Sequence, residues 1–283
     1  MTAGEREVTW YGTASIRVRI RNLSLLFDPF VPLPGASHIL SLKDFLPAPY
    51  VLVTHGHFDH LYNVSDLVKR GTRKVFATST PCATLMREGV RSDALHLIQK
   101  GDRLHFSIAT GALVKSADRS LSDADTDIAT VTVLRGRHTR FGAALVLSTL
   151  LNFRMLRYGG NTKILYHANK AFCENGETVV YEVSCGTTLV TILGSLAIDE
   201  DERYTLNPDL LVLPYQGNSH LLKCAAGIVK RLMPRAVMLD HHDDSFPPLS
   251  RDIDTAPFVA YMAQNHPGIP IIAAKQGIAH LVG

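Results

Sequence analysis

The segment that most constrains this chain is HGHFDH at residues 55–60, which places four metal-ligating side chains within six residues. It follows the apolar run at residues 50–54, which is typical of a buried strand. Imidazoles two residues apart after a strand can converge on one ion, and the carboxylate and imidazole that follow can reach that ion or a second one. Zn²⁺ suits such a mixed set of nitrogen and oxygen donors. The alternative is a histidine-rich surface turn, but Gly56 favours a tight, closely approaching backbone.

The composition excludes several classes of protein. The 283 residues can bury a core without disulfides, and 46% hydrophobic and 19% charged residues are typical of a globular protein. A net charge of +3 argues against nucleic acid or an anionic membrane as an obligatory partner. No apolar run reaches the ~18 residues of a membrane span, so we expect no stable membrane insertion. The polar first residues lack a signal-peptide core, and the cysteines lack CxxC spacing. We therefore expect a cytoplasmic protein with buried free thiols at Cys82, Cys173, Cys185 and Cys224.

Strand patterns dominate the chain, with helical patterns between them and no linker or repeat. We therefore expect one domain of mixed α and β structure over residues 1–283. Helices are expected at residues 61–70, 80–89, 220–232 and 254–265. The nearly uncharged residues 141–153 are too short to span a membrane. They fit either a buried helix or an apolar flap at the mouth of a pocket.

The HxHxDH pattern at residues 55–60 resembles the signature of the metallo-β-lactamase superfamily. The resemblance implies an α+β fold, a four-layer αββα sandwich with two mixed sheets face to face. It also implies that His55 and His57 hold one ion, and that Asp59 and His60 contribute to a second. Asp59 could in addition orient the nucleophile, which makes it the candidate catalytic residue.

Asp28 ends a short apolar strand at residues 24–27 and is followed by proline. The resemblance implies that its carboxylate contacts and orients a metal-binding histidine. Taken alone, the residue fits a turn or cap equally well.

His138 follows the strand pattern at residues 128–134. The resemblance implies that it is the third ligand of the first ion. The alternative is that Arg135, Arg137 and Arg140 bind an anionic substrate while His138 is a bystander.

The run from residue 240 to 248 contains adjacent histidines. It resembles the last superfamily motif, whose histidine completes the second metal position. In closer relatives the motif resembles His-x-Asp-x-Phe-Pro, and we expect His241 rather than His242 to be the ligand. Adjacent side chains at a strand end point in opposite directions, so we expect only one to ligate.

Ser195 departs from the superfamily pattern, because the position usually holds an aspartate that bridges two metals. A neutral hydroxyl is a poor ligand for Zn²⁺. Without a bridging carboxylate, two dications repel each other with less compensation. We therefore predict one firmly held ion at the three histidines and a weak or empty second position, unless another acid such as Asp243 replaces the bridge.

The resemblance implies a metal-dependent hydrolase that uses a metal-bound hydroxide to cleave an ester, lactone or phosphodiester bond. The expected cofactor is Zn²⁺, as one or two ions, with Mn²⁺ or Fe²⁺ as alternatives, and the expected partner is a small-molecule substrate. Trp10, Gly12 and Phe246 resemble the branch that includes the L-ascorbate-6-phosphate lactonase and the phospholipase-D-like hydrolases. The alternative, motivated by Ser195, is a degenerate member that binds metal or ligand without efficient turnover. The sequence does not indicate an oligomeric state.

Overall fold

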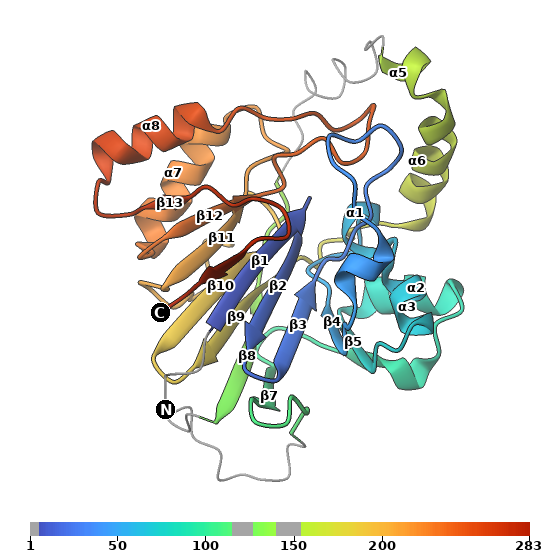
Figure 1. Cartoon of the computed structure of the whole chain (residues 1–283), viewed down its shortest axis with the longest axis horizontal. Helices are drawn as coiled ribbons and strands as arrows, with labels where there is room; N and C mark the ends of the chain where they lie inside the picture. The colour runs from blue at the N-terminus through green and yellow to red at the C-terminus, as the bar shows by residue number, and fades with distance from the viewer. Residues whose placement is uncertain (1–5, 115–126, 140–153) are drawn as a thin grey trace.

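The computed structural model describes residues 6–114, 127–139 and 154–283, whose strands form two seven-stranded sheets (Figure 1). The first sheet has the order β14-β1-β2-β3-β4-β5-β6, with β1 Arg6–Gly12, β2 Ser15–Ile20, β3 Leu23–Phe27, β4 Tyr50–Leu52, β5 Lys74–Ala77, β6 Leu95–Leu97 and β14 Ala279–Leu281. The second has the order β13-β12-β11-β10-β9-β8-β7, with β7 Arg103–Ser107, β8 Ile128–Arg135, β9 Val179–Cys185, β10 Thr188–Leu193, β11 Leu210–Pro214, β12 Val237–Asp240 and β13 Ile271–Ile272.

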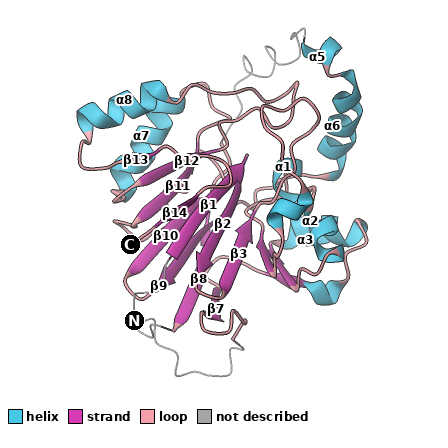
Figure 2. Ribbon diagram, in the orientation of Figure 1, coloured by secondary structure: helices cyan, strands magenta, loops and turns pink. Residues whose placement is uncertain are grey.

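Helices lie on the outer sides of the two sheets (Figure 2). The α-helices of the described residues are α1 Phe58–Leu61, α2 Val64–Lys69, α3 Ser79–Arg87, α5 Arg154–Arg157, α6 Gly159–Ala171, α7 Leu221–Leu232 and α8 Ala256–Asn265. Two 3₁₀ turns, η1 Leu42–Phe45 and η2 Ser92–Ala94, complete them.

Three apolar clusters define the layers. The central cluster packs one sheet against the other, with Phe27 on β3 and Tyr181 on β9 among its fully buried members. A second cluster packs the first sheet against α1, α2, α3 and α6, and a third packs the second sheet against α7 and α8. This is the expected four-layer αββα sandwich, and the fold prediction is confirmed.

The central strands are apolar on both faces because each face is covered. On β11, Leu210 and Val212 point into the central cluster, while Leu211 and Leu213 point toward the helices. The same alternation explains why the strand before HGHFDH reads as a continuous apolar run.

Several local predictions differ from the structure. The helix expected at residues 61–70 is two shorter ones, and α1 already begins at Phe58, inside the HGHFDH segment. Helix α6 was not predicted. Residues 141–153, interpreted as a buried helix or a flap, lie outside the described residues. The cysteines are free, as expected, but only two are buried, since Cys173 is exposed and Cys224 half-buried.

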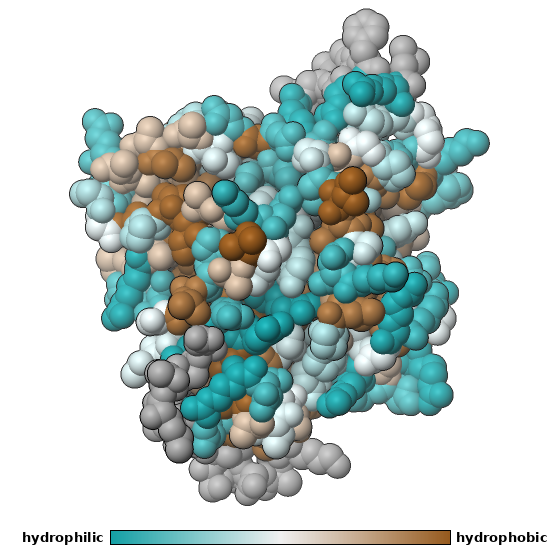
Figure 3. Space-filling view, in the orientation of Figure 1, coloured by the Kyte–Doolittle hydropathy of each residue, from teal (hydrophilic) through white to brown (hydrophobic). Residues whose placement is uncertain are grey.

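Apolar and polar side chains are interspersed on the molecular surface. On the face in Figure 3, patches of hydrophobic residues are separated by hydrophilic ones. None of the helices in the described ranges has both the length and the apolar character of a membrane span.

Candidate metal centre

The predicted ligands gather where strands of both sheets end. In the first sheet β3 and β4 are parallel, so Asp28 and His55 emerge at the same edge. In the second sheet β10, β11 and β12 are parallel, which brings out Ser195 and His241 side by side with the end of β11. Strand β8 is antiparallel to β9, which is antiparallel to β10, so β8 also delivers His138 to that edge.

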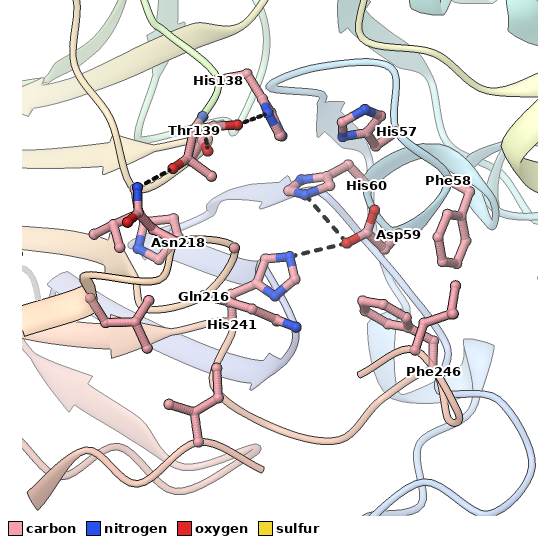
Figure 4. A pocket seen from close by; sticks show the side chains of 18 of the residues that line it. His57, Phe58, Asp59, His60, His138, Thr139, Gln216, Asn218, His241 and Phe246 are labelled. Atoms are coloured by element: carbon pink, nitrogen blue, oxygen red, sulfur yellow. Dashed lines mark hydrogen bonds and ion pairs between the residues drawn. The ribbon is translucent and has the colours of Figure 1, made fainter. Parts of the chain in front are cut away.

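The first group of potential ligands consists of three histidines. His55 Nε2 lies 3.1 Å from His57 Nδ1. The ring centroid of His138 lies 4.6 Å from that of His57 and 5.0 Å from that of His55. Figure 4 shows His57 and His138 next to each other. One nitrogen of each ring lies within 4.8 Å of the others, a spacing that fits a single ion.

The second group consists of a carboxylate and two histidines. Asp59 Oδ2 lies 3.0 Å from His241 Nε2 and 3.7 Å from His60 Nε2. Dashed lines mark both contacts in Figure 4. These three atoms also fall within the 4.8 Å limit of a metal-binding group. The first sheet supplies Asp59 and His60, and the second supplies His241.

Asp28 and Thr54 determine which nitrogens face the two groups. Asp28 Oδ1 accepts a hydrogen bond from the Thr54 amide, and Asp28 Oδ2 accepts one from the Thr54 hydroxyl at 2.6 Å. Asp28 Oδ2 also lies 2.9 Å from His60 Nδ1, and the Thr54 hydroxyl lies 3.0 Å from His55 Nδ1. With Nδ1 engaged in this way, the Nε2 atoms of both rings are left for a ligand. Asp28 thus contacts His60, as the resemblance implies, and its part in orienting a metal ligand stays a prediction.

Thr139 holds the loop that carries His138. His138 Nδ1 lies 2.7 Å from the Thr139 carbonyl oxygen, which leaves Nε2 toward the other histidines. The Thr139 amide donates to Ser195 Oγ at 3.0 Å, and its hydroxyl accepts from Asn218 Nδ2 at 3.0 Å. Ser195 therefore supports the third histidine through its neighbour.

The three-histidine group is electrically neutral. Burial lowers the pKa of His55 well below its ordinary value, and the nearby His60 and His57 lower it further. Burial likewise lowers the pKa of His57 to about 4 and lowers that of His138. Neutral imidazoles keep a lone pair, so these rings can bind a cation at neutral pH.

The Asp59 group has the opposite character. Burial by itself disfavours a charged carboxylate, but His60 and the hydrogen bond from His241 hold the pKa of Asp59 below its usual range. Burial also disfavours a charged His241, yet Asp59 raises the pKa of this imidazole. Asp59 is therefore an ionised acceptor at neutral pH.

The turn at Gly12-Thr13 fixes His241. The backbone of His241 is left-handed, at φ 57°, and its amide donates to the Thr13 carbonyl at 2.7 Å. Thr13 is also left-handed, at φ 49°, which is costly for a β-branched residue. Its amide donates to Asp243 Oδ1 at 2.8 Å, and its carbonyl also accepts from Trp10 Nε1.

His242 points away from the group, as the alternation of side chains predicts. Its ring stacks on Trp10 with a centroid distance of 4.6 Å. The Trp10-Tyr11-Gly12 pattern thus has a local role in presenting His241.

A cavity of about 530 Å³ opens over both groups of ligands. The lining includes five of the potential ligands: His57, Asp59, His60, His138 and His241. Much of the remaining wall is apolar and includes Phe58, Phe172, Leu196, Leu221, Phe246 and Ile253.

Several residues that the sequence offered as candidates for substrate or metal binding do not border this cavity. Arg135 and Arg137 are exposed and do not line it, and the Arg135 guanidinium lies 3.8 Å from Asp199. The cavity therefore gives no support to a substrate-binding cluster at the two described arginines, while Arg140 lies outside the described residues. Asp243 is not placed to replace the bridging carboxylate that is absent at Ser195. It does not line the cavity, and it accepts hydrogen bonds from the Thr13 amide and the Ser245 hydroxyl.

Four positions that complete the site were missed in the sequence: Thr54, Thr139, Asn218 and Arg251. Thr54 directly precedes the HGHFDH segment, and its position at a strand end was the one available signal. The other three have no spacing that distinguishes them from ordinary loop residues.

The two sheets, with two groups of potential metal ligands at their shared edge, place this protein in the class of αββα-sandwich proteins with a candidate metal centre. A family model described as a beta-lactamase superfamily domain matches residues 7–241, and the chain belongs to this family.

Two sequence relatives and one solved structure illustrate the range of similarity. A UPF0173 metal-dependent hydrolase of Carboxydothermus hydrogenoformans is 33% identical over 100 residues, which are 35% of this chain and 42% of that protein. The match thus spans less than half of that relative. A protein of the same name from Methanobrevibacter smithii is 21% identical over 272 residues, 96% of this chain and 95% of the relative.

The structure of Igni18, a metallo hydrolase from Ignicoccus hospitalis, has the same fold. It superposes with a TM-score of 0.61 at 14% identity and covers 98% of this chain and 97% of its own.

Proposed function

We propose that this chain is a metal-dependent hydrolase of a small-molecule substrate, with Zn²⁺ as its principal ion. The observation that carries the proposal is the convergence of His55 and His57, after one strand, with His138, after another, beside a cavity of about 530 Å³. The named activity of the relatives supports the same class of reaction.

The donors fit this ion. Three neutral imidazoles with their Nδ1 or Nε2 atoms within 4.8 Å of one another match the ligand set of catalytic zinc sites, in which three protein ligands leave a position open. Bound there, Zn²⁺ would polarise a substrate oxygen and lower the pKa of a coordinated water to about 7.

Asp59 is the residue of this chain that can orient the attacking water. Its carboxylate is ionised and lines the cavity, with Oδ2 held by His241. It can accept a hydrogen bond from the attacking water and so orient it. In hydrolysis the hydroxyl of that water joins the carbonyl carbon or the phosphorus, the bond to the leaving oxygen breaks, and that oxygen takes the proton.

Ser195 makes the two metal positions unequal in this proposal. Its hydroxyl accepts from the Thr139 amide and carries no charge to offset a second dication. We therefore expect one equivalent of firmly bound metal, at the three histidines.

Replacing Ser195 by aspartate is expected to add a second equivalent, because the carboxylate can still accept from Thr139 while it bridges to the Asp59, His60 and His241 group. Metal content after gel filtration, measured by mass spectrometry, checks this. Ser195→Asn is the matched control, since it retains an acceptor of similar shape without the charge and should leave the stoichiometry unchanged. Two full equivalents in the unmodified protein would contradict the prediction.

Ester, lactone and phosphodiester bonds all suit this arrangement, and the branch resemblance favours the same three. A chromogenic acyl ester and a bis-phosphodiester, each tested with Zn²⁺, Mn²⁺ or Fe²⁺, separate carbonyl from phosphoryl chemistry. We expect hydrolysis of at least one, lost on chelation and restored by Zn²⁺.

The second candidate is a family member that binds metal or ligand without turnover, for which the neutral Ser195 is the specific motivation. Tight metal binding with no hydrolysis of either substrate by any of the three ions would favour it.

A further inference from the structure

The cavity has a preformed apolar side next to Asp59. The rings of Phe58 and Phe246 lie 5.2 Å apart, and both pack edge-on against the buried Phe30. Both rings line the cavity, and Figure 4 shows them next to Asp59. Because Phe30 fixes both rings, this surface can receive an apolar group without rearranging.

The segment between β12 and α8 contributes a different kind of surface. Leu249, Arg251 and Ile253 all line the cavity, so this strip presents one cation between two apolar side chains. Arg251 is exposed, which places its guanidinium at the solvent side of the cavity.

Arg251 stands out among the charged groups there. Apart from the histidines, Asp59 and Arg251 are the only charged residues among the described residues of the wall. Within the part of the chain that the structure describes, Arg251 has no carboxylate within ion-pair distance, whereas the nearby Arg154 pairs with Asp244. An exposed guanidinium between apolar side chains of the wall, in a cavity where Asp59 and His60 are buried, is suited to an anionic group of a ligand.

We propose, resting on the hydrolase function above, that the substrate has an apolar body and carries a negative charge at the end remote from the scissile bond, where Arg251 pairs with it. The two groups of potential metal ligands surround the bond to be cleaved. Phe58 and Phe246 contact the apolar body of the substrate, and Arg251 selects for its negative charge.

Two esters of equal length test the proposal. The 4-nitrophenyl ester of hexanoic acid is neutral, and the 4-nitrophenyl monoester of adipic acid carries one remote carboxylate. The protein is expected to prefer the anionic ester by about fivefold in kcat/KM, mainly through KM, because a partly exposed ion pair contributes modestly. The preference should shrink as salt is added.

Arg251→Gln is expected to abolish this preference, and Arg251→Lys to restore part of it. Arg137→Gln is the matched control, because Arg137 is an exposed arginine near the ligands that does not line the cavity. Equal preference in the Arg251→Gln variant and the unmodified protein would overturn the proposal.

Calorimetry with the two corresponding anilides, which resist hydrolysis, separates this proposal from the function on which it rests. Tighter binding of the adipic anilide that depends on Arg251 would uphold the substrate class even if neither ester is cleaved. Ester cleavage without any dependence on charge or on Arg251 would overturn the substrate class and leave the hydrolase intact. Anilide binding that needs the metal but not Arg251 would place the carboxylate on the metal and would also overturn it.

Discussion

Replacing His57 by alanine is expected to abolish firm metal binding and to lower kcat/KM by about 10³-fold, which corresponds to the several kcal/mol that a catalytic metal supplies. His57 Nδ1 lies 3.1 Å from His55 Nε2, and among the described residues the three-histidine group contains no fourth donor. Metal content by mass spectrometry and hydrolysis of the better chromogenic substrate provide the two measurements.

His220→Ala is the control for this experiment. His220 is exposed at the start of α7 and does not line the cavity, so its loss should leave metal content and rate unchanged. Full metal occupancy in the His57→Ala variant would show that the three-histidine group is not the primary site.

Gly56→Ala is expected to lower the free energy of unfolding by about 1–3 kcal/mol, the usual range for overpacking. A Cβ on Gly56 would lie 2.0 Å from the carbonyl oxygen of Cys173, where the chain leaves α6. Since backbone must move to relieve this contact, His55 and His57 on either side should shift and metal binding should weaken. Denaturant unfolding with and without chelator, together with metal content, measures both effects.

Gly227→Ala is the matched control. Gly227 lies inside α7 with no atom near the position of a Cβ, so alanine there should stabilise the protein by about 0.5–1 kcal/mol. Unchanged stability and metal content in the Gly56→Ala variant would mean that the ligand loop accommodates a side chain at no cost.

Much of the fold could be predicted because its layers leave a direct record in the sequence. Strands covered on both faces are continuous apolar runs, and the ligands follow these runs directly, as His55 follows β4 and His241 follows β12. Parallel strands then bring ligands from distant parts of the sequence to one edge. His241 lies beside Asp59 while His242 stacks on Trp10, as expected if only one of two adjacent histidines points toward the site.

The remainder depends on contacts that sequence patterns do not record. Thr139 acts largely through its backbone amide and carbonyl, which carry no signature of their own. Helix α6 is polar over much of its length and buries only Asn161, Leu165 and Ala168, so its periodicity is weak. Arg251 could not be distinguished from Arg135 or Arg137 without knowing which loop turns toward the cavity.

The ligand groups draw on both halves of the sandwich, since His55 and His57 follow a strand of the first sheet and His138 follows a strand of the second. An ion shared between them would act as a removable cross-link, sealing the open edge of the two-sheet core. Its binding energy would then reinforce the folded chain in proportion to how tightly the ion is held. The free concentration of the ion would thus set the stability of the folded protein as well as its activity.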